Sequence, residues 1–369
     1  MSYEENAPLV VDVGSYKTRY GFGGDDAPYE ERETVIYRPT SCGSPAGVPI
    51  GCPDSYFGRT WTAQQKYHFG PFRPYHPVER GMIKDFHDMD LIWHRTLGRA
   101  DPESPVVLSY AARMPDETCE KIAQTVFESH YLARLCLANS AYLDMYASAR
   151  TTCVIVGIGH GVTTIVPFVD GRAVSSAVET LPIAGLDLTN YLKEILRNPP
   201  KNVDEIVDMK EKLCYVAQDF GAEMEKAASS SDIEKEYVLA DGRAISLKDE
   251  RFRCTEPLFQ PALLGCESPG LHELIFSSIV KCKVDIRRTL FRNIVLCGGS
   301  SLFNGLADRL TKELTALVPP GMTINIHASD FSTWFGGSVL SSLSSTSWIS
   351  HEEYDETGPS IIHKKNYLV

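Results

Sequence analysis

Residues 151–171 (TTCVIVGIGHGVTTIVPFVDG) repeat a pattern that occurs once before, in LVVDVGSYKTRYGFGG at residues 9–24. In both copies a β-branched apolar run enters a glycine-containing turn and a second strand leaves it, which is the pattern of a β-hairpin. Two copies of one hairpin predict two similar halves. At 369 residues the chain also exceeds the size that one hydrophobic core usually serves, so we expect two domains.

The glycine turns indicate anion binding. Glycine has no Cβ, so backbone N–H groups in such a turn can approach a bound anion closely. Two turns that face each other would hold a polyphosphate between them. A third turn, LCGGSS at residues 296–301, follows a short apolar strand at 293–296 and is expected to contribute to the same cleft.

Composition restricts the class of partner and the compartment. The formal net charge of −12 argues against a nucleic-acid backbone as the main partner, because that binding needs a basic face. No stretch reaches the roughly 18 apolar residues of a membrane span, and MSYEENAPLV does not read as a signal peptide. We therefore expect a globular protein of the cytosol or nucleus, with no nucleic-acid or membrane partner.

The ten cysteines occur singly, with no CxxC pair. Most lie in apolar runs, as Cys136, Cys153 and Cys297 do, which is typical of small buried side chains in a reducing compartment. A zinc site is not expected.

Strands alternate with helices along the chain, which favours an α/β fold. Helices are predicted at residues 86–97, 115–130, 139–150, 186–197, 203–218, 270–281, 284–291, 304–317 and 336–343, and strands at 105–109 and 322–327. A hairpin is predicted around Asp241-Gly242, after a polar connector at residues 229–236. Residues 38–55 are rich in Gly, Pro and Ser and are predicted to be a mobile loop with an apolar tip at residues 48–50.

Segments spread over nearly the whole chain resemble actin and actin-related proteins. The most specific are LVVDVGS, LPIAGLDLTNYL, KEKLCYVAQDF, FQPALLGCESPGLHE and WISHEEYDETGPSIIHKK. The resemblance implies the actin-like ATPase-domain fold: two similar α/β domains, each with a smaller inserted subdomain. The implied parts are a first large domain (1–32, 70–147 and 334–369), a small mobile subdomain (33–69), a second large domain (148–180 and 271–333) and its inserted subdomain (181–270).

The resemblance also implies a nucleotide site. Asp12 stands where the family holds the metal through water, and Arg19 stands where the family has a phosphate-binding lysine. The two phosphate turns, the grip on sugar and adenine and the adenosine loop correspond to Gly14, Ser15, Gly159, Gly161, Val162, Gly185, Lys210, Glu211, Gly298, Gly299 and Ser300.

Departures from the family pattern fall on the phosphate chemistry. Tyr16 replaces a glycine of the first turn, and Arg19 replaces a compact lysine charge with a planar fork. Gly157 and His160 stand where the family has acidic residues, although Mg²⁺ prefers carboxylate and water oxygens. Metal binding should therefore weaken sharply.

The machinery for hydrolysis is also altered. The family holds the attacking water with a glutamine and a histidine, and this chain has Ser140 and Thr164 at those positions. Neither side chain reaches as far or accepts a proton as well. We expect no catalytic residue, no resident metal, and either no cofactor or weakly bound ATP or ADP with Mg²⁺.

The leading hypothesis is a divergent actin-related structural protein of the cytoskeleton, in the cytoplasm, with a degenerate pseudo-ATPase site. It would act through protein contacts as a scaffold, filament subunit or cap. One alternative is an ATP-binding, polymerising actin with weak ATPase activity, and another is an actin-related subunit of a nuclear chromatin complex. A small-molecule kinase is disfavoured, because the resemblance extends into the actin-specific C-terminus.

Two surfaces are candidates for contacts with cytoskeletal or actin-like partners. The resemblance implies that residues 259–272, with Leu263, Leu264 and Gly265, form a loop that inserts into neighbouring protomers. It also implies a partner cleft near Tyr146, Ala149, Val339 and Leu343.

Overall fold

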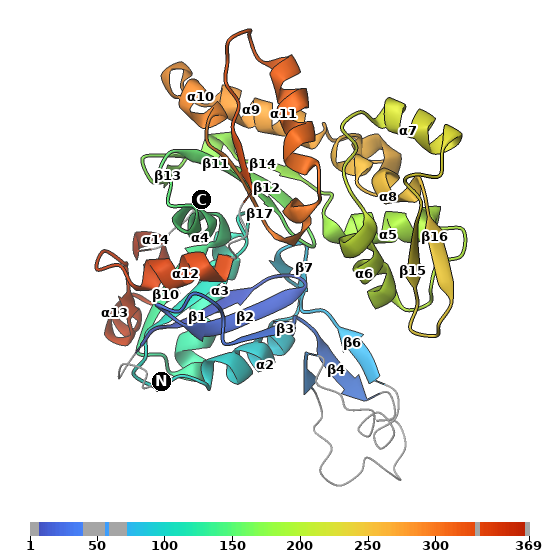
Figure 1. Cartoon of the computed structure of the whole chain (residues 1–369). Helices are drawn as coiled ribbons and strands as arrows, with labels where there is room; N and C mark the ends of the chain where they lie inside the picture. The colour runs from blue at the N-terminus through green and yellow to red at the C-terminus, as the bar shows by residue number, and fades with distance from the viewer. Residues whose placement is uncertain (1–6, 40–55, 59–71, 329–332, 366–369) are drawn as a thin grey trace, which may run out of the picture. The chain divides into compact units, whose positions relative to one another are not determined.

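The computed structural model describes residues 7–39, 56–58, 72–328 and 333–365. These residues form two compact units, one within Met1–Ala147 and Phe331–Val369 and the other within Ser148–Asp330 (Figure 1). The finer division of each unit into a large and an inserted part stays a prediction.

The first unit is built on a mixed sheet of strand order β19-β10-β9-β1-β2-β3. The strands are β1 (Leu9–Val13), β2 (Lys17–Phe22), β3 (Glu30–Glu33), β9 (Val106–Tyr110), β10 (Arg134–Asn139) and β19 (Ile349–Ser350). β1 pairs antiparallel with β2 and parallel with β9. The predicted N-terminal hairpin is therefore present as β1 and β2.

Helices cover both faces of this sheet (Figure 1). The helices are α2 (Phe86–Leu97), α3 (Asp116–His130), α4 (Ser140–Ala147), α12 (Thr333–Ser341), α13 (His351–Thr357) and α14 (Ile362–Lys365). Leu9 and Val11 pack with α2 and α3, whereas Val10 packs with Trp334 of α12. Because successive strand residues point to opposite faces, β1 is apolar on both sides, as its LVV sequence indicates.

The second unit repeats this arrangement. Its sheet has the order β13-β12-β11-β17-β18, with β14 also paired to β12. The strands are β11 (Cys153–Ile158), β12 (Thr163–Val169), β13 (Arg172–Ala173), β14 (Glu179–Leu181), β17 (Ile294–Cys297) and β18 (Ile326–Ala328). β11 pairs antiparallel with β12 and parallel with β17, the same pairing that β1 makes with β2 and β9.

Helices and short turns complete the second unit. They are η1 (Ser175–Ala177), α5 (Gly185–Ile195), α6 (Val203–Leu213), α7 (Phe220–Ser229), α8 (Glu250–Arg253), η2 (Glu256–Leu258), η3 (Pro261–Leu264), α9 (Leu271–Lys281), α10 (Val284–Phe291), η4 (Gly299–Leu302) and α11 (Leu306–Leu317). The hairpin β15 (Lys235–Val238) and β16 (Ala244–Leu247) turns at Gly242, which has a positive φ of 86°. This confirms the Asp-Gly turn signal.

Several predicted boundaries are wrong. The helix predicted at residues 203–218 ends at Leu213, where the Arg251 side chain donates to the Leu213 carbonyl. Val216 is buried as expected, but its N–H donates to Asn304 instead of continuing the helix. The sequence reading also missed α7, which Asp219 caps by accepting from the Ala222 N–H, and it began β18 four residues too early.

A small sheet of order β5-β4-β6 also belongs to the first unit, with β4 (Ile36–Pro39), β5 (Tyr56–Phe57) and β6 (Phe72–Tyr75). Arg38, expected at the start of a loop, lies in β4, and its guanidinium pairs with Asp88 at the start of α2. Residues 40–55, the rest of the predicted loop, lie outside the described residues. A second short ribbon is formed by β7 (Val78–Glu79) and β8 (Met82–Ile83).

No helix in the described ranges is both long enough and apolar enough to cross a lipid bilayer. All eight cysteines between Cys119 and Cys297 that the structure describes are free, and seven of them are buried. This confirms that Cys136, Cys153 and Cys297 are buried side chains.

Candidate functional site

The turn between β1 and β2 is tight. The Gly14 N–H donates to the Lys17 carbonyl at 3.0 Å, and a Cβ on Gly14 would lie 3.1 Å from that oxygen. The Ser15 hydroxyl accepts from the Gly81 N–H at 2.9 Å, so the turn between β7 and β8 supports it. Tyr16 is half-buried, and its ring centroid lies 6.0 Å from the Lys17 ammonium.

Charged side chains form a row across three strands of the first unit. Asp12 on β1 faces Arg19 on β2, and Arg19 faces Glu31 on β3. The Arg19 guanidinium lies 3.7 Å from the Asp12 carboxylate and donates to Glu31 at 2.6 Å. Ser109, at the end of β9, donates to Asp12 at 2.6 Å and accepts from the Val13 N–H. Arg19, which the resemblance places at the phosphate, thus lies between two carboxylates.

The environment shifts the two carboxyl groups in opposite directions. Burial raises the pKa of Asp12, although Arg19 and the Ser109 hydroxyl oppose the rise. Burial alone would raise the pKa of Glu31 too, but hydrogen bonds and charge from Lys17 and Arg19 lower it below its ordinary value. Glu31 is therefore a stably ionised partner of these cations.

The turn between β11 and β12 repeats the geometry of the first turn without its charges. The Gly159 N–H donates to the Val162 carbonyl at 3.3 Å, as Gly14 does to Lys17. The row equivalent to Asp12, Arg19 and Glu31 consists of Gly157, Thr164 and Thr180. A Cβ on Gly157 would lie 3.2 Å from the Thr164 hydroxyl. Two of the predicted departures, Gly157 and Thr164, are therefore direct cross-strand neighbours.

Other predicted site residues of the second unit gather around Gly159. Its carbonyl accepts from the Gly185 N–H at 3.0 Å and from the Ser300 hydroxyl at 3.1 Å. Gly298 has a φ of 86°, and a Cβ there would lie 2.5 Å from the Ile158 carbonyl oxygen, so glycine is required. Gly299 begins η4 and has open space around it.

Lys210 of α6 contacts this cluster through its ammonium group. Its ammonium donates to the Gly185 carbonyl and to the Thr189 hydroxyl, each at 2.9 Å, and the side chain is buried. Burial lowers the pKa of Lys210. Glu211 is exposed on α6, whereas Gly161 and Val162 lie in the turn itself. The lysine expected to grip a nucleotide thus holds the start of α5.

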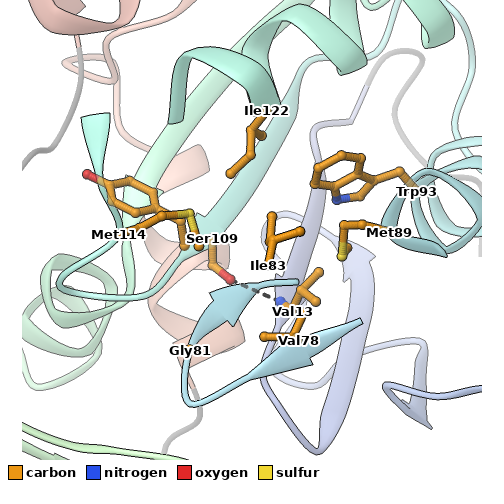
Figure 2. Close-up of a pocket in the computed structure, with 10 residues that line it drawn as sticks. Val13, Val78, Gly81, Ile83, Met89, Trp93, Ser109, Met114 and Ile122 are labelled. Carbon is orange, nitrogen blue, oxygen red and sulfur yellow. Dashed lines mark hydrogen bonds between the residues drawn. The ribbon is translucent and has the colours of Figure 1, made fainter. Parts of the chain in front are cut away.

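A small cavity lies behind the first turn (Figure 2). Its volume of about 20 Å³ has room for about one water molecule. Figure 2 shows the Ser109 hydroxyl directed at the Val13 backbone, with Met89 and Trp93 on the opposite wall. The bond from the Val13 N–H to Ser109 therefore fixes the end of β1 beside this cavity, and the bond from Gly81 to Ser15 fixes the turn that follows.

Asp144 of α4 is buried on the same side of the sheet as Asp12, with Ser140 at the start of the helix. Burial raises its pKa to about 7, the nearby Asp12 charge adds to the rise, and a hydrogen bond from Thr333 at 2.8 Å opposes it. The native state therefore favours the protonated form. The stability from this preference is complete below the unfolded pKa of about 4 and is lost as the pH rises through about 7.

We expect the free energy of unfolding of Asp144→Asn, relative to that of the wild type, to rise by about 2–3 kcal/mol from pH 5 to pH 8. The substitution removes the ionisable proton but keeps an acceptor for Thr333. Urea unfolding at several pH values measures this. Asp208→Asn is the contrast, because bonds from Lys212 and Tyr237 lower the pKa of Asp208 below its ordinary value of about 4, so its effect should not change between pH 5 and pH 8. A pH-independent effect of Asp144→Asn would contradict the assignment.

Sequence reasoning missed the residues that surround the predicted ones. Glu31, Ser109, Thr189 and Gly81 carry no motif. Glu31 and Glu33 stand two residues apart, as Lys17 and Arg19 do, and this spacing of opposite charges was the available signal. The other three become visible only through tertiary contacts.

The two α/β units share one arrangement, an antiparallel glycine hairpin next to a parallel strand, which defines a duplicated α/β fold with a glycine turn in each half. The sequence model of the Actin family matches residues 3–207 and 200–367, nearly the whole chain. This chain belongs to the actin family, and the resemblance seen in its motifs is confirmed. The family binds ATP or ADP with a divalent metal, and its members are weak ATPases at most.

The backbone turns of this chain fit such a nucleotide, but its charged side chains do not. The backbone fits, because the Gly14 and Gly159 turns are both closed and free of Cβ atoms at the position that approaches an anion. The charges do not fit, because Arg19 is held by Asp12 and Glu31, and the matching row of the second unit is neutral.

Proposed function

We propose that this chain is a divergent structural member of the actin family that binds nucleotide weakly and does not hydrolyse it. One observation carries the proposal: the charges needed for Mg²⁺ and phosphate are neutralised within the first unit and missing from the second. Arg19 pairs with Glu31 at 2.6 Å, and Gly157 and Thr164 take the places that Asp12 and Arg19 hold in the other hairpin.

Hydrolysis is disfavoured independently of binding. The family's water-positioning glutamine and histidine correspond to Ser140 and Thr164, whose side chains are shorter. The Thr164 hydroxyl lies next to the empty Cβ position of Gly157. A positioned general acid or base typically contributes about 10²–10⁴ in rate, and neither hydroxyl accepts a proton well enough to take that role. We therefore propose a pseudo-ATPase.

Protein contacts would then carry the function, in the cytoskeleton of the cytoplasm. Leu263 is 42% exposed, and Gly265 follows it with a positive φ of 67°, which turns the chain out of η3. In the first unit Leu343 is 38% exposed, and Tyr146 and Val339 are half-buried. These apolar residues support the two proposed contact surfaces for actin-like partners.

An ATP-binding, polymerising actin is the second candidate. The intact Asp12, the retained cation at Arg19 and the two closed glycine turns favour it. It differs from the leading proposal in both nucleotide chemistry and assembly.

Phosphate release and a native pull-down distinguish the two candidates. We expect no Mg²⁺-dependent phosphate release above background, together with a stable complex that contains an actin-like partner in a native pull-down. Leu263→Asp should weaken that complex, and Val238→Asp, at a more exposed apolar residue (66% against 42%) outside both surfaces, should not. Release at the rate of an ordinary actin would contradict the proposal.

A further inference from the structure

The two neighbouring glutamates of β3, Glu30 and Glu31, lie on opposite faces of the sheet and bind different partners. Its register places Glu31 opposite Arg19 and Glu30 opposite Tyr20. Neighbouring residues of a strand point to opposite faces, so Glu31 shares the face of Asp12 while Glu30 lies on the other face. The contacts agree, because Glu30 accepts from the Tyr20 hydroxyl and from Arg32.

Glu31 binds both basic side chains of the first hairpin. One of its oxygens accepts from the Lys17 ammonium at 2.5 Å, and the other accepts from Arg19 at 2.6 Å. Arg19 also lies 3.7 Å from Asp12. Glu31 thus spans two cations, as a phosphate with two oxygens does.

Arg19 is the cation that the resemblance places at the phosphate, so an anion bound at the Gly14 turn would compete with Glu31 for Arg19. Lys17 closes the turn through its carbonyl, and Arg19 lies two residues further along β2. A polyphosphate would have to displace Glu31 from them and would also be repelled by its charge. About one third of the Glu31 side chain is exposed (37%), so the exchange is open to solvent.

We infer that Glu31 is an internal anion that occupies the phosphate-binding cations of the first hairpin and sets the affinity of the chain for polyphosphates. The inference deepens the proposed weak nucleotide binding and rests on it. The Glu31 charge is one cause of weak binding that a single substitution can remove, and it is distinct from the missing carboxylates of the second hairpin.

Calorimetric titration with MgATP tests the inference on the full chain. Glu31→Gln keeps the size of the side chain and an acceptor for Lys17 but removes the charge, and we expect it to bind about tenfold more tightly than the wild type. Glu30→Gln removes the same charge from the same strand on the opposite face, and it should stay within about twofold of the wild type because charge at a distance is screened. The gain should disappear in Glu31→Gln/Arg19→Gln.

The outcomes separate the inference from the proposed function. No gain in Glu31→Gln, including no measurable binding at millimolar ATP, overturns the inference, and so does an equal gain in Glu30→Gln. A gain that survives loss of Arg19 overturns it as well. The affinity of the wild type tests only the proposed function, whereas the ratio between variant and wild type tests Glu31.

Discussion

Gly157→Asp combined with His160→Asp is expected to raise the Mg²⁺-dependent affinity for ATP by about 10–100-fold, the range by which carboxylates around a metal change its affinity. The two variants restore the acidic residues that the family has in its second turn. The new carboxylate at 157 would lie in the row that now holds Thr164 and Thr180, and the Thr164 hydroxyl must move by a few tenths of an ångström to admit it.

The magnesium dependence provides the control. Without Mg²⁺ the added carboxylates repel ATP, so the double variant should bind more weakly than the wild type. Calorimetry with Mg²⁺ and with a chelator measures both directions on one protein, and the melting temperature checks that it is folded. An unchanged affinity in Mg²⁺ would mean that the missing carboxylates are not what weakens the site.

Gly336→Ala is expected to destabilise the first unit by about 3 kcal/mol or more, at the upper end of the cost of overpacking. α12 crosses α4 so closely that a Cβ on Gly336 would overlap the Leu143 carbonyl, which belongs to the backbone and cannot rotate away. Gly337 is nearly as restricted, with its Cβ position 2.5 Å from a Val10 methyl group.

Urea unfolding measures this loss. Gly221→Ala is the matched control, since Gly221 also lies within a helix and its Cβ position contacts nothing closer than 3.6 Å. That change should be neutral or stabilising by about 0.4–1 kcal/mol, because alanine restricts the unfolded chain. Equal effects at both glycines would contradict the close packing of α4 and α12.

The sequence predicted the elements whose signal is local. The two glycine hairpins, α2, α10 and the Asp-Gly turn all show a period or a turn residue that the fold uses unchanged. α6 was predicted too long because its apolar spacing continues past Leu213, while the Arg251 side chain and the pairing of Val216 with Asn304 end the helix. Those tertiary contacts override the local pattern.

The residues of the candidate site were also predictable only where their signal is local. Its glycines and Asp12 were predicted from turn chemistry and from the resemblance. The pairing of Arg19 with Glu31, and that of Gly157 with Thr164, depends on strand register, which single-residue patterns do not encode. The role of Lys210 in holding the start of α5 likewise needed its bonds to Gly185 and Thr189.

Calorimetric titration of ATP into the wild-type chain, with and without Mg²⁺ and with its melting temperature recorded, tests the central claim most directly. A ligand that binds only the native state raises the melting temperature, and it raises it further the more tightly it binds. Weak or no heat and an unchanged melting temperature are the predicted results. Tight, Mg²⁺-dependent binding with a raised melting temperature would contradict the account and favour an ATP-binding actin.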